Sequence, residues 1–327
     1  MMKLNKLFAM ILSIAILMTA LGTAGAIADE EKLRVVTTIF PIYDWVRETA
    51  GTEENAEITL LLDSGVDLHS YQPTAADLMK IAACDLFIYV GGESDEWVED
   101  ALREAINPNM IVINLLECLG DDVKMEELVE GMEHEQDEDH EEEDHEHEEE
   151  ADEHIWLSLR NAQKLVKIIA GKLAEADPVH ADVYQANAAA YGEKLSALDA
   201  AYAETTEQAA YQTILFGDRF PFRYLADDYG LTYYAAFSGC SAETEASFQT
   251  IVFLAQKVDE LGLPAVLTIE GTNHRIAETI IQTTGNRNQK LLTLDSMQGI
   301  TAGDVQAGAS YLSVMQANLD VLREALN

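Results

Sequence analysis

The chain has 327 residues, 48% of them apolar, which is enough material for two domains of ordinary size with their own cores. The formal net charge of -39 at pH 7 excludes nucleic acid and anionic lipid head groups as partners, and it favours cations. Three cysteines, Cys84, Cys118 and Cys240, allow at most one internal disulfide, so disulfides do not build this fold. Cys84 and Cys118 follow or lie in apolar stretches, and we expect both to be buried.

Residues 1–28 have the features of a signal peptide for export. Lys3 and Lys6 precede an apolar run from Leu7 to Leu21, and Ala26-Ile27-Ala28 offers a cleavage site of small residues before Asp29. We therefore expect an extracytoplasmic protein, in the periplasm or on the outer face of the cell membrane. A retained membrane anchor is the alternative reading of the same segment.

Residues 29–178 predict an N-terminal lobe in which strands alternate with helices. The β-branched and apolar runs that predict strands are 33–40, 57–62, 85–90 and 110–115. Helical segments are expected to begin near Pro41, Thr74 and Trp97, between these strands. Such alternation is typical of a parallel sheet with helices on both faces.

An acidic, histidine-rich tract occupies residues 133–150 of this lobe, where thirteen of eighteen residues are Asp or Glu. A run this charged cannot bury apolar surface, so we expect a disordered loop. Acidic residues alone would indicate a solubilising tract. Imidazole, however, is a common ligand of zinc and copper, so interleaved histidines favour weak, multiple sites of metal capture. These accessory residues are His134, His140, His145 and His147.

After the tract, helical spacing dominates before strands return. The stretch 179–208 predicts one helix of ~30 residues, which would be ~45 Å long. Because that length exceeds the diameter of a small domain, we predict a rigid helix connecting two lobes. Residues 209–327 repeat the strand–helix alternation and form the predicted C-terminal lobe. The predicted fold class is therefore α/β, with two βα lobes joined by one long helix.

Two further histidines stand in loops of the kind where open α/β sheets place their ligands. His69 lies in Gly-Val-Asp-Leu-His-Ser-Tyr-Gln-Pro, and His154 lies in Asp-Glu-His-Ile-Trp-Leu-Ser at the end of the acidic tract. Each histidine alone is typical of a structural polar residue. Together the motifs resemble the metal-binding receptors of ABC importers for zinc and manganese, and most closely the high-affinity zinc-uptake receptors. The similarity extends over nearly the whole mature chain.

The resemblance implies a metal site in the cleft between the lobes, little hinge bending, and His69 and His154 as the first two ligands. At the third position zinc receptors have a histidine and manganese receptors a glutamate. An ungapped match places Arg219 there, a permanent cation that cannot bind a metal ion. A shift by one residue offers Asp218, whose carboxylate zinc accepts.

Two alternatives to Asp218 as the third ligand stay open. Asp218 could instead cap the helix that begins at Pro221. His274, near the start of a later helix, could replace the missing histidine. The fourth, acidic ligand corresponds in the resemblance to Glu270, at the end of a predicted strand.

The predicted function is that of an extracytoplasmic, monomeric solute-binding protein that captures Zn²⁺, delivers it to an ABC permease and catalyses no reaction. Two imidazoles with one or two carboxylates suit Zn²⁺, and Mn²⁺ is the first alternative because it accepts more oxygen ligands. The competing class is a secreted zinc-dependent hydrolase. A catalytic zinc needs an open coordination position, and a fully occupied site lacks one, which favours transport over hydrolysis. A metal-buffering adhesin is the third reading.

Overall fold

The computed structural model describes residues 32–51, 55–132, 150–241, 245–271 and 273–327. The predicted signal peptide and the four histidines of the acidic tract lie outside these residues. The chain from Leu33 to Asn327 forms one unit. Among the described residues, no helix combines the length and apolar character needed to span a bilayer.

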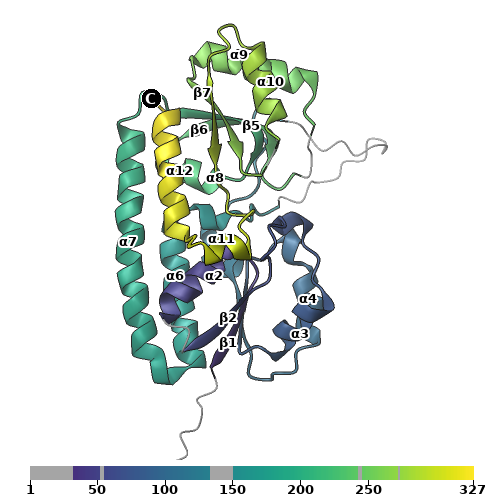
Figure 1. Ribbon diagram of the computed structural model, residues 1–327, viewed down its shortest axis with the longest axis vertical. Coiled ribbons are helices and arrows are strands. Elements are labelled where there is room, and N and C mark those ends of the chain that lie inside the picture. Colours follow the sequence, from purple (N-terminus) through teal and green to yellow (C-terminus); the bar gives the residue numbers. More distant parts are fainter. Residues whose placement is uncertain (1–31, 52–54, 133–149, 242–244, 272) are drawn as a thin grey trace, which may run out of the picture. The chain divides into compact units, whose positions relative to one another are not determined.

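The N-terminal lobe is built on a four-stranded parallel sheet with the strand order β2-β1-β3-β4. Figure 1 shows its strands β1 and β2 side by side. Its central strand β1 is buried, with Val35 in register with Ile58 on one side and Leu86 on the other. The strands are β1 (Leu33–Thr37), β2 (Ala56–Leu60), β3 (Leu86–Tyr89) and β4 (Ile111–Asn114). The helices are α2 (Phe40–Ala50), α3 (Ala75–Ala83), α4 (Trp97–Arg103) and α5 (Leu115–Leu119).

The C-terminal lobe repeats this plan with the parallel strand order β6-β5-β7-β8. Its strands are β5 (Thr213–Phe220), β6 (Thr232–Ser238), β7 (Ala265–Ile269) and β8 (Lys290–Leu294). Its helices are α8 (Arg223–Tyr229), α9 (Phe248–Leu261), α10 (Arg275–Thr283), α11 (Ala302–Gln306) and α12 (Tyr311–Ala325). The predicted alternation of strands and helices is confirmed in both lobes, and the short helices α5 and α11 are additions that the sequence did not predict.

The strand β5 contains a bulge close to its carboxyl end. Phe216 lies opposite Ala235 of β6, whereas Arg219 lies opposite Phe237, so β5 takes three steps where β6 takes two. An extra residue of this kind breaks the alternation of side chains and changes the direction in which the following ones point. The bulge therefore decides how Asp218 and Arg219 are presented.

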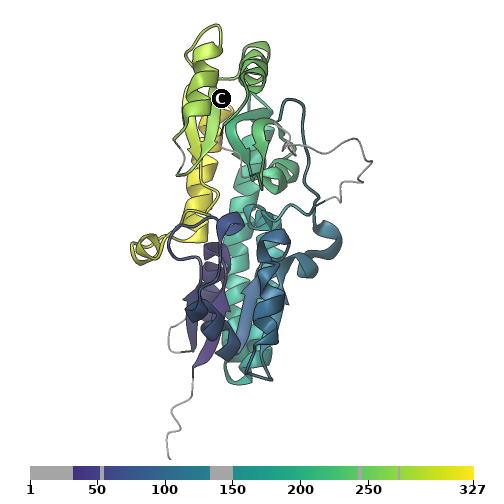
Figure 2. The same ribbon diagram turned by 90° about the vertical axis from the view of Figure 1, so that its right-hand side faces the viewer.

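The long helix that links the lobes is confirmed as α7 (Ala181–Glu207), 27 residues or ~40 Å long. It follows α6 (Leu159–Ala176) and packs along it. Asn187 of α7 donates a hydrogen bond to the Thr49 carbonyl in α2, and Tyr202 donates to the Met315 carbonyl in α12. Figures 1 and 2 both show α12 beside α7. The connecting helix is thus fastened to elements at the beginning and at the end of the chain.

Packing between the lobes centres on Trp156, which is 1% exposed. Its indole N–H donates to the Ser296 carbonyl at 2.8 Å, and its own carbonyl accepts from the Tyr311 hydroxyl at 2.7 Å. Ser296 follows β8, and Tyr311 begins α12. The segment that carries His154 is therefore held by the C-terminal third of the chain.

Candidate metal centre

His154 precedes the turn η4 (Ile155–Leu157) and is completely buried. Its Nδ1 lies 2.9 Å from Oδ1 of Asp152, which also accepts the His154 backbone N–H at 2.9 Å. Because a carboxylate only accepts hydrogen bonds, Nδ1 carries the proton and Nε2 keeps its lone pair. A carboxylate behind the imidazole in this way is the usual support of a metal-binding histidine.

His69 lies on the turn η1 (Leu68–Ser70), in the loop between β2 and α3. Asp67 caps this turn by accepting the His69 backbone N–H at 3.0 Å. The His69 Nδ1 lies 2.8 Å from Oγ of Ser94 and 3.5 Å from Oε2 of Glu153. Burial, together with the nearby His154, lowers the pKa of His69 to about 3. At neutral pH the ring is therefore uncharged, the form that binds a metal ion.

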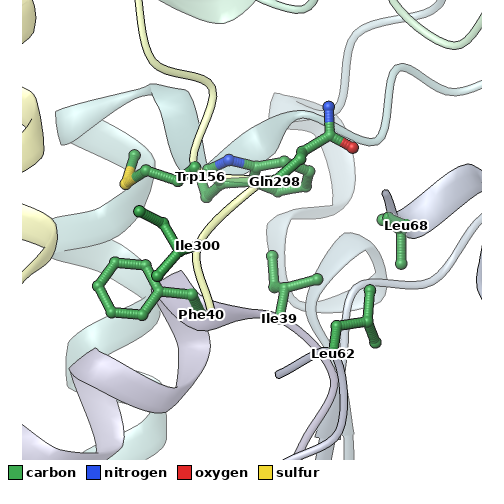
Figure 3. A pocket seen from close by; sticks show the side chains of 8 residues that line it. Ile39, Phe40, Leu62, Leu68, Trp156, Gln298 and Ile300 are labelled. Atoms are coloured by element: carbon green, nitrogen blue, oxygen red, sulfur yellow. The ribbon is translucent and has the colours of Figure 1, made fainter. Parts of the chain in front are cut away.

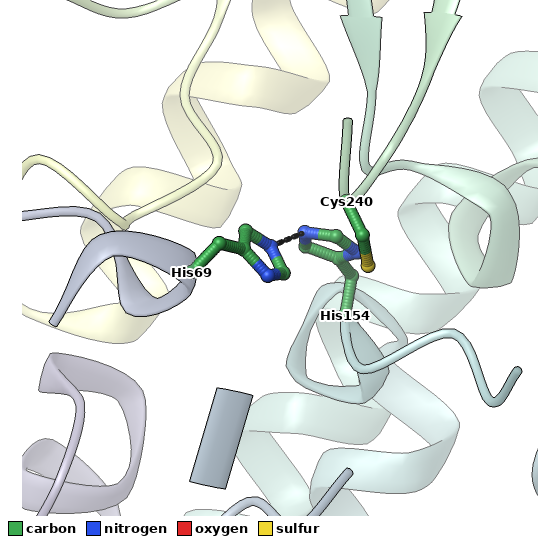
Figure 4. Close-up of side chains that lie close together, drawn as sticks. All are labelled: His69, His154 and Cys240. Carbon is green, nitrogen blue, oxygen red and sulfur yellow. Dashed lines mark hydrogen bonds between the residues drawn. The ribbon is translucent and has the colours of Figure 1, made fainter. Parts of the chain in front are cut away.

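The two imidazoles point their Nε2 atoms at one another across 3.2 Å (Figure 4). Two nitrogens bound at 2.0–2.1 Å to one tetrahedral zinc would be separated by about 3.3 Å. The observed separation matches this value closely. Gly239 allows the approach of the C-terminal lobe to this pair, because a Cβ at that position would lie 3.0 Å from Cε1 of His154.

A third side chain that can bind a metal ion lies beside the histidines. Within the described ranges, the group of His, Cys, Asp or Glu side chains that could hold a metal ion comprises His69, His154 and Cys240, with one ligand atom of each within 4.8 Å of the others. Cys240 follows β6, and Figure 4 shows it approaching His154 from the side opposite His69. Burial, and then the charge of Glu126, raises the pKa of its thiol far above the usual range.

From the sequence, Cys240 had no predicted role beyond a possible disulfide. The structure shows Cys84, Cys118 and Cys240 all as free thiols. Cys84 is buried as expected, whereas Cys118 is exposed, so that expectation was wrong for Cys118. A usable signal existed for Cys240, because it stands two residues beyond the carboxyl end of a strand, where this kind of sheet places its ligands.

The two predicted carboxylates, Asp218 and Glu270, lie outside the group of three. Asp218 accepts the Arg219 backbone N–H at 2.9 Å and the Ile269 N–H at 3.4 Å. Glu270 follows β7 and accepts the Ser296 N–H at 2.7 Å and the Ser296 hydroxyl at 2.6 Å. Both carboxylates thus hold backbone near the carboxyl ends of β5, β7 and β8.

Glu270 has a link to the histidines through one loop. It also accepts the backbone N–H of Gln298 at 3.2 Å, and the Gln298 side-chain nitrogen lies 3.5 Å from Nε2 of His154. His274 directly precedes α10, with a φ of 54°, and like Glu270 it lies outside the group of three. The alternative that Asp218 caps a helix is wrong, because α8 begins at Arg223 with Phe222 as its N-cap residue.

Arg219, at the doubtful third position, bridges the two lobes. Its Nη2 donates to Oδ2 of Asp67 at 2.5 Å, and its Nη1 lies 3.5 Å from the Ser241 carbonyl. Burial opposes ionisation of Asp67, but the charge and hydrogen bond of Arg219, together with His69, outweigh it and lower the pKa of this carboxyl. Since Asp67 caps the turn of His69, and Ser241 follows Cys240, Arg219 ties the loops of both candidate ligands together.

A small pocket lies near the metal centre, and Figure 3 shows the side chains that line it. A pocket of about 10 Å³ lies against Leu68, Trp156 and Gln298, which neighbour the two histidines in sequence or in space. That volume holds about one water molecule. Sites for organic ligands are roughly 300–1,000 Å³. This pocket therefore has no space for an organic solute of drug size.

Two parallel-sheet lobes joined by a long helix, with the facing imidazoles of His69 and His154 where the lobes meet, define a two-lobed solute-binding protein. The family described as "Zinc-uptake complex component A periplasmic" matches residues 35–325 of the chain. The protein therefore belongs to this family.

Individual relatives agree with this assignment. The zinc-binding lipoprotein AdcA of Streptococcus pneumoniae is 34% identical over 293 residues, which cover 90% of this chain and 56% of the relative. The high-affinity zinc uptake system protein ZnuA of Bacillus subtilis is 30% identical over 305 residues, which cover 93% of this chain and 90% of the relative. The chain thus spans little more than half the length of the streptococcal relative.

A solved structure shows the same fold. The Zn(II)-bound ZnuA-like domain of S. pneumoniae AdcA is 31% identical and has a TM-score of 0.70, with 90% of this chain and 99% of that domain covered. The metal-dependent lipoprotein YcdH of B. subtilis, at 27% identity, has a TM-score of 0.73 over 90% of this chain and 100% of that protein.

Proposed function

We propose that this protein captures Zn²⁺ outside the cytoplasm and delivers it to the membrane subunit of an ABC permease. The observation that carries the proposal is the pair of Nε2 atoms of His69 and His154, which face one another 3.2 Å apart. Each ring is braced at Nδ1 by an oxygen atom, from Ser94 or Asp152. The names of the relatives, a zinc-binding lipoprotein and a zinc uptake protein, support the choice of metal.

The donor set favours zinc over manganese. Imidazole nitrogen suits zinc, whereas manganese prefers oxygen ligands. Asp218 and Glu270 remain proposed oxygen ligands, and each would have to exchange a backbone amide for the ion. The net contribution of one hydrogen bond to stability is about 0.5–1.5 kcal/mol, so each exchange would cost free energy of that order.

The accessory histidines of the acidic tract fit the same function. Glu150 is the first residue after the tract that the structure describes, and Ala151 forms an antiparallel bridge with Met125. Asp152, which supports His154, follows directly. Weak sites at His134, His140, His145 and His147 would raise the local concentration of metal close to the main site.

Receptor function is favoured over hydrolysis because the site is closed. A hydrolase needs an open metal position and space for its substrate. Here His154 is completely buried, the His69 side chain is 12% exposed, and the pocket of about 10 Å³ beside Trp156 admits no organic substrate. An adhesin or metal buffer would use the same site without delivering its ion to a permease, so transfer to the permease separates those readings.

The proposal is tested by calorimetric titration of the metal-free mature protein with Zn²⁺ and with Mn²⁺. We expect one tight Zn²⁺ per chain and much weaker Mn²⁺. The variant His154→Ala should lose the tight phase. Its matched control is His180→Ala, because His180 pairs with Asp177 at the turn before α7 and has no place in the site. A wild-type protein without a tight Zn²⁺ phase, or a His154→Ala variant that keeps it, would overturn the proposal.

A further inference from the structure

We propose that the Sγ atom of Cys240 is the third ligand of the captured ion, which makes the site a two-histidine, one-thiolate centre. The inference rests on the proposed function, since it takes metal binding at His69 and His154 as given. It adds a ligand of a different chemical class from the carboxylates that the sequence suggested. The expected cargo is therefore a thiophilic ion such as Zn²⁺, and oxygen-preferring Mn²⁺ is disfavoured.

Distances bring the thiol within reach of an ion held by the two imidazoles. One ring nitrogen of each histidine and the Sγ of Cys240 lie within 4.8 Å of one another. In a tetrahedral zinc site with Zn–N of 2.0–2.1 Å and Zn–S of 2.3 Å, sulfur and nitrogen are about 3.6 Å apart. A rotation of the Cys240 side chain therefore suffices to bring the thiol to an ion held by the two imidazoles.

The loop that carries Cys240 is held in place on several sides. The Cys240 backbone N–H donates to Oε1 of Glu126 at 3.0 Å. The preceding Gly239 packs so closely that a Cβ there would lie 3.0 Å from both the His154 ring and the Phe220 carbonyl. The following Ser241 accepts from Arg219 at 3.5 Å. These contacts hold the Cys240 backbone beside the histidines, and such preorganisation lowers the free-energy cost of binding.

Competition from the predicted carboxylates is weak in this arrangement. Glu270 would have to give up hydrogen bonds from the Ser296 amide and hydroxyl, and Asp218 would have to release the Ile269 amide. Cys240 would give up the hydrogen bond between its thiol and Glu126, but it keeps the backbone hydrogen bond to the same carboxylate. On coordination the thiol loses its proton to solvent and the sulfur donates an electron pair to the ion, with no change of oxidation state.

The neighbouring charges balance the resulting centre. One thiolate with a divalent ion leaves a net charge of +1, and the buried carboxylates of Asp152 and Glu153 stand directly behind the two imidazoles. Asp152 contacts Nδ1 of His154, and Glu153 lies 3.5 Å from Nδ1 of His69. Carboxyl groups behind imidazole ligands strengthen the hold of those ligands on a cation.

Cobalt spectroscopy tests the third ligand directly. The metal-free full-length mature protein is loaded with one equivalent of Co²⁺, and bound Co²⁺ is measured by elemental analysis after gel filtration. We expect a sulfur-to-cobalt charge-transfer band in the near ultraviolet. The variant Cys240→Ser should bind Co²⁺ without this band, whereas the control Cys118→Ser, which changes an exposed thiol, should keep it. Circular dichroism verifies the fold of each variant.

The outcomes separate this inference from the proposed function. Stoichiometric Co²⁺ without the band in the wild-type protein would overturn the thiolate ligand and leave the receptor function standing. A wild-type protein that binds neither Co²⁺ nor Zn²⁺ would overturn both.

Zn²⁺ affinity supplies a second measurement of the same point. For Cys240→Ser we expect a loss larger than the 10–100-fold that follows changes behind a metal ligand. The variant Cys240→Asp, which supplies an oxygen ligand, should lower the ratio of Zn²⁺ affinity to Mn²⁺ affinity. An unchanged Zn²⁺ affinity and an unchanged preference in correctly folded variants would contradict the assignment.

Discussion

The carboxylate of Asp152 decides which nitrogen of His154 is free to bind an ion. It accepts hydrogen bonds from both the backbone N–H and Nδ1 of His154, so the ring has one orientation and one tautomer. Trp156 anchors the same turn to the Ser296 carbonyl. The position of a single atom, Nε2, therefore depends on contacts to residues on both sides of the interface.

Replacing Asp152 by Asn keeps the shape of this contact and removes its charge. We expect Asp152→Asn to weaken Zn²⁺ binding by 10–100-fold, because a group behind a metal ligand tunes its basicity and orientation. Calorimetric titration checks this loss. The matched control is Asp177→Asn, since Asp177 contacts Nδ1 of His180 at 2.6 Å in the same way, outside the site. Equal affinities of Asp152→Asn and the wild-type protein would show that the ring is held by packing alone.

At the scale of elements, the carboxyl ends of β5, β6 and β7 supply the C-terminal wall of the site. The bulge in β5 turns Arg219 toward Asp67 of the other lobe, and the segment after β6 brings Cys240 to the histidines. Parallel strands place their carboxyl ends at one edge of a sheet, so loops far apart in sequence gather there. The two lobes face each other with these edges.

The acidic tract provides a prediction about a separable element. We expect deletion of residues 133–149, with a short Gly-Ser linker in their place, to keep both the fold and the tight Zn²⁺ phase. The reason is that a segment of this composition cannot contribute to a hydrophobic core. Calorimetry should show that only weak binding is lost. Disappearance of the tight phase would mean that the tract supplies a primary ligand.

The connecting helix α7 provides a prediction about stability. Gly192 lies inside this helix, and a Cβ added there would meet no atom within 4 Å. We therefore expect Gly192→Ala to raise the free energy of unfolding by about 0.5–1 kcal/mol, because alanine loses less backbone entropy than glycine in a helix. Urea denaturation measures the change. The Zn²⁺ affinity of Gly192→Ala should stay unchanged. A destabilised variant would indicate that α7 needs this glycine for bending.

Across the whole molecule, one buried carboxyl joins the beginning of the chain to its end. Asp44 of α2 accepts the backbone N–H of Tyr311, the first residue of α12, at 2.8 Å and pairs with Arg47. Burial raises the pKa of Asp44 to about 6, against the lowering effect of Arg47. The folded state consequently holds a proton on this group at pH values where the unfolded chain has lost it.

The sign of the resulting pH dependence follows from proton binding. Between the unfolded pKa of 3.8 and about 6, the folded state binds more protons at Asp44, so its contribution to stability falls as pH rises. We expect the free energy of unfolding to be higher at pH 5 than at pH 7.5, and Asp44→Asn to flatten this slope. Urea titrations at both values measure it. The control Asp320→Asn changes an exposed partner of Arg323 on α12 and should leave the slope of stability against pH unchanged. An identical slope in the wild-type protein and both variants would show that Asp44 does not cause the pH dependence.

Much of this architecture can be predicted from neighbours along the chain. The apolar runs of β1, β3 and β7, the helix start at Thr74 and the unbroken helical pattern of α7 are local features. The motifs around His69 and His154 likewise marked the histidines that the structure brings together. Short helices such as α5 and α11 were missed because five residues carry too little periodicity to be recognised.

The sequence by itself determined the two-lobed α/β plan, the connecting helix and the two histidines, because each depends on residue patterns within a short stretch. Tertiary structure alone decided the remaining neighbours of the site. Whether Asp218 or Arg219 faces the other lobe depends on a bulge in β5. Cys240 reaches the histidines only when the loops of two sheets meet. Such distances arise from packing between lobes, and the spacing of residues along the chain does not encode them in any local pattern.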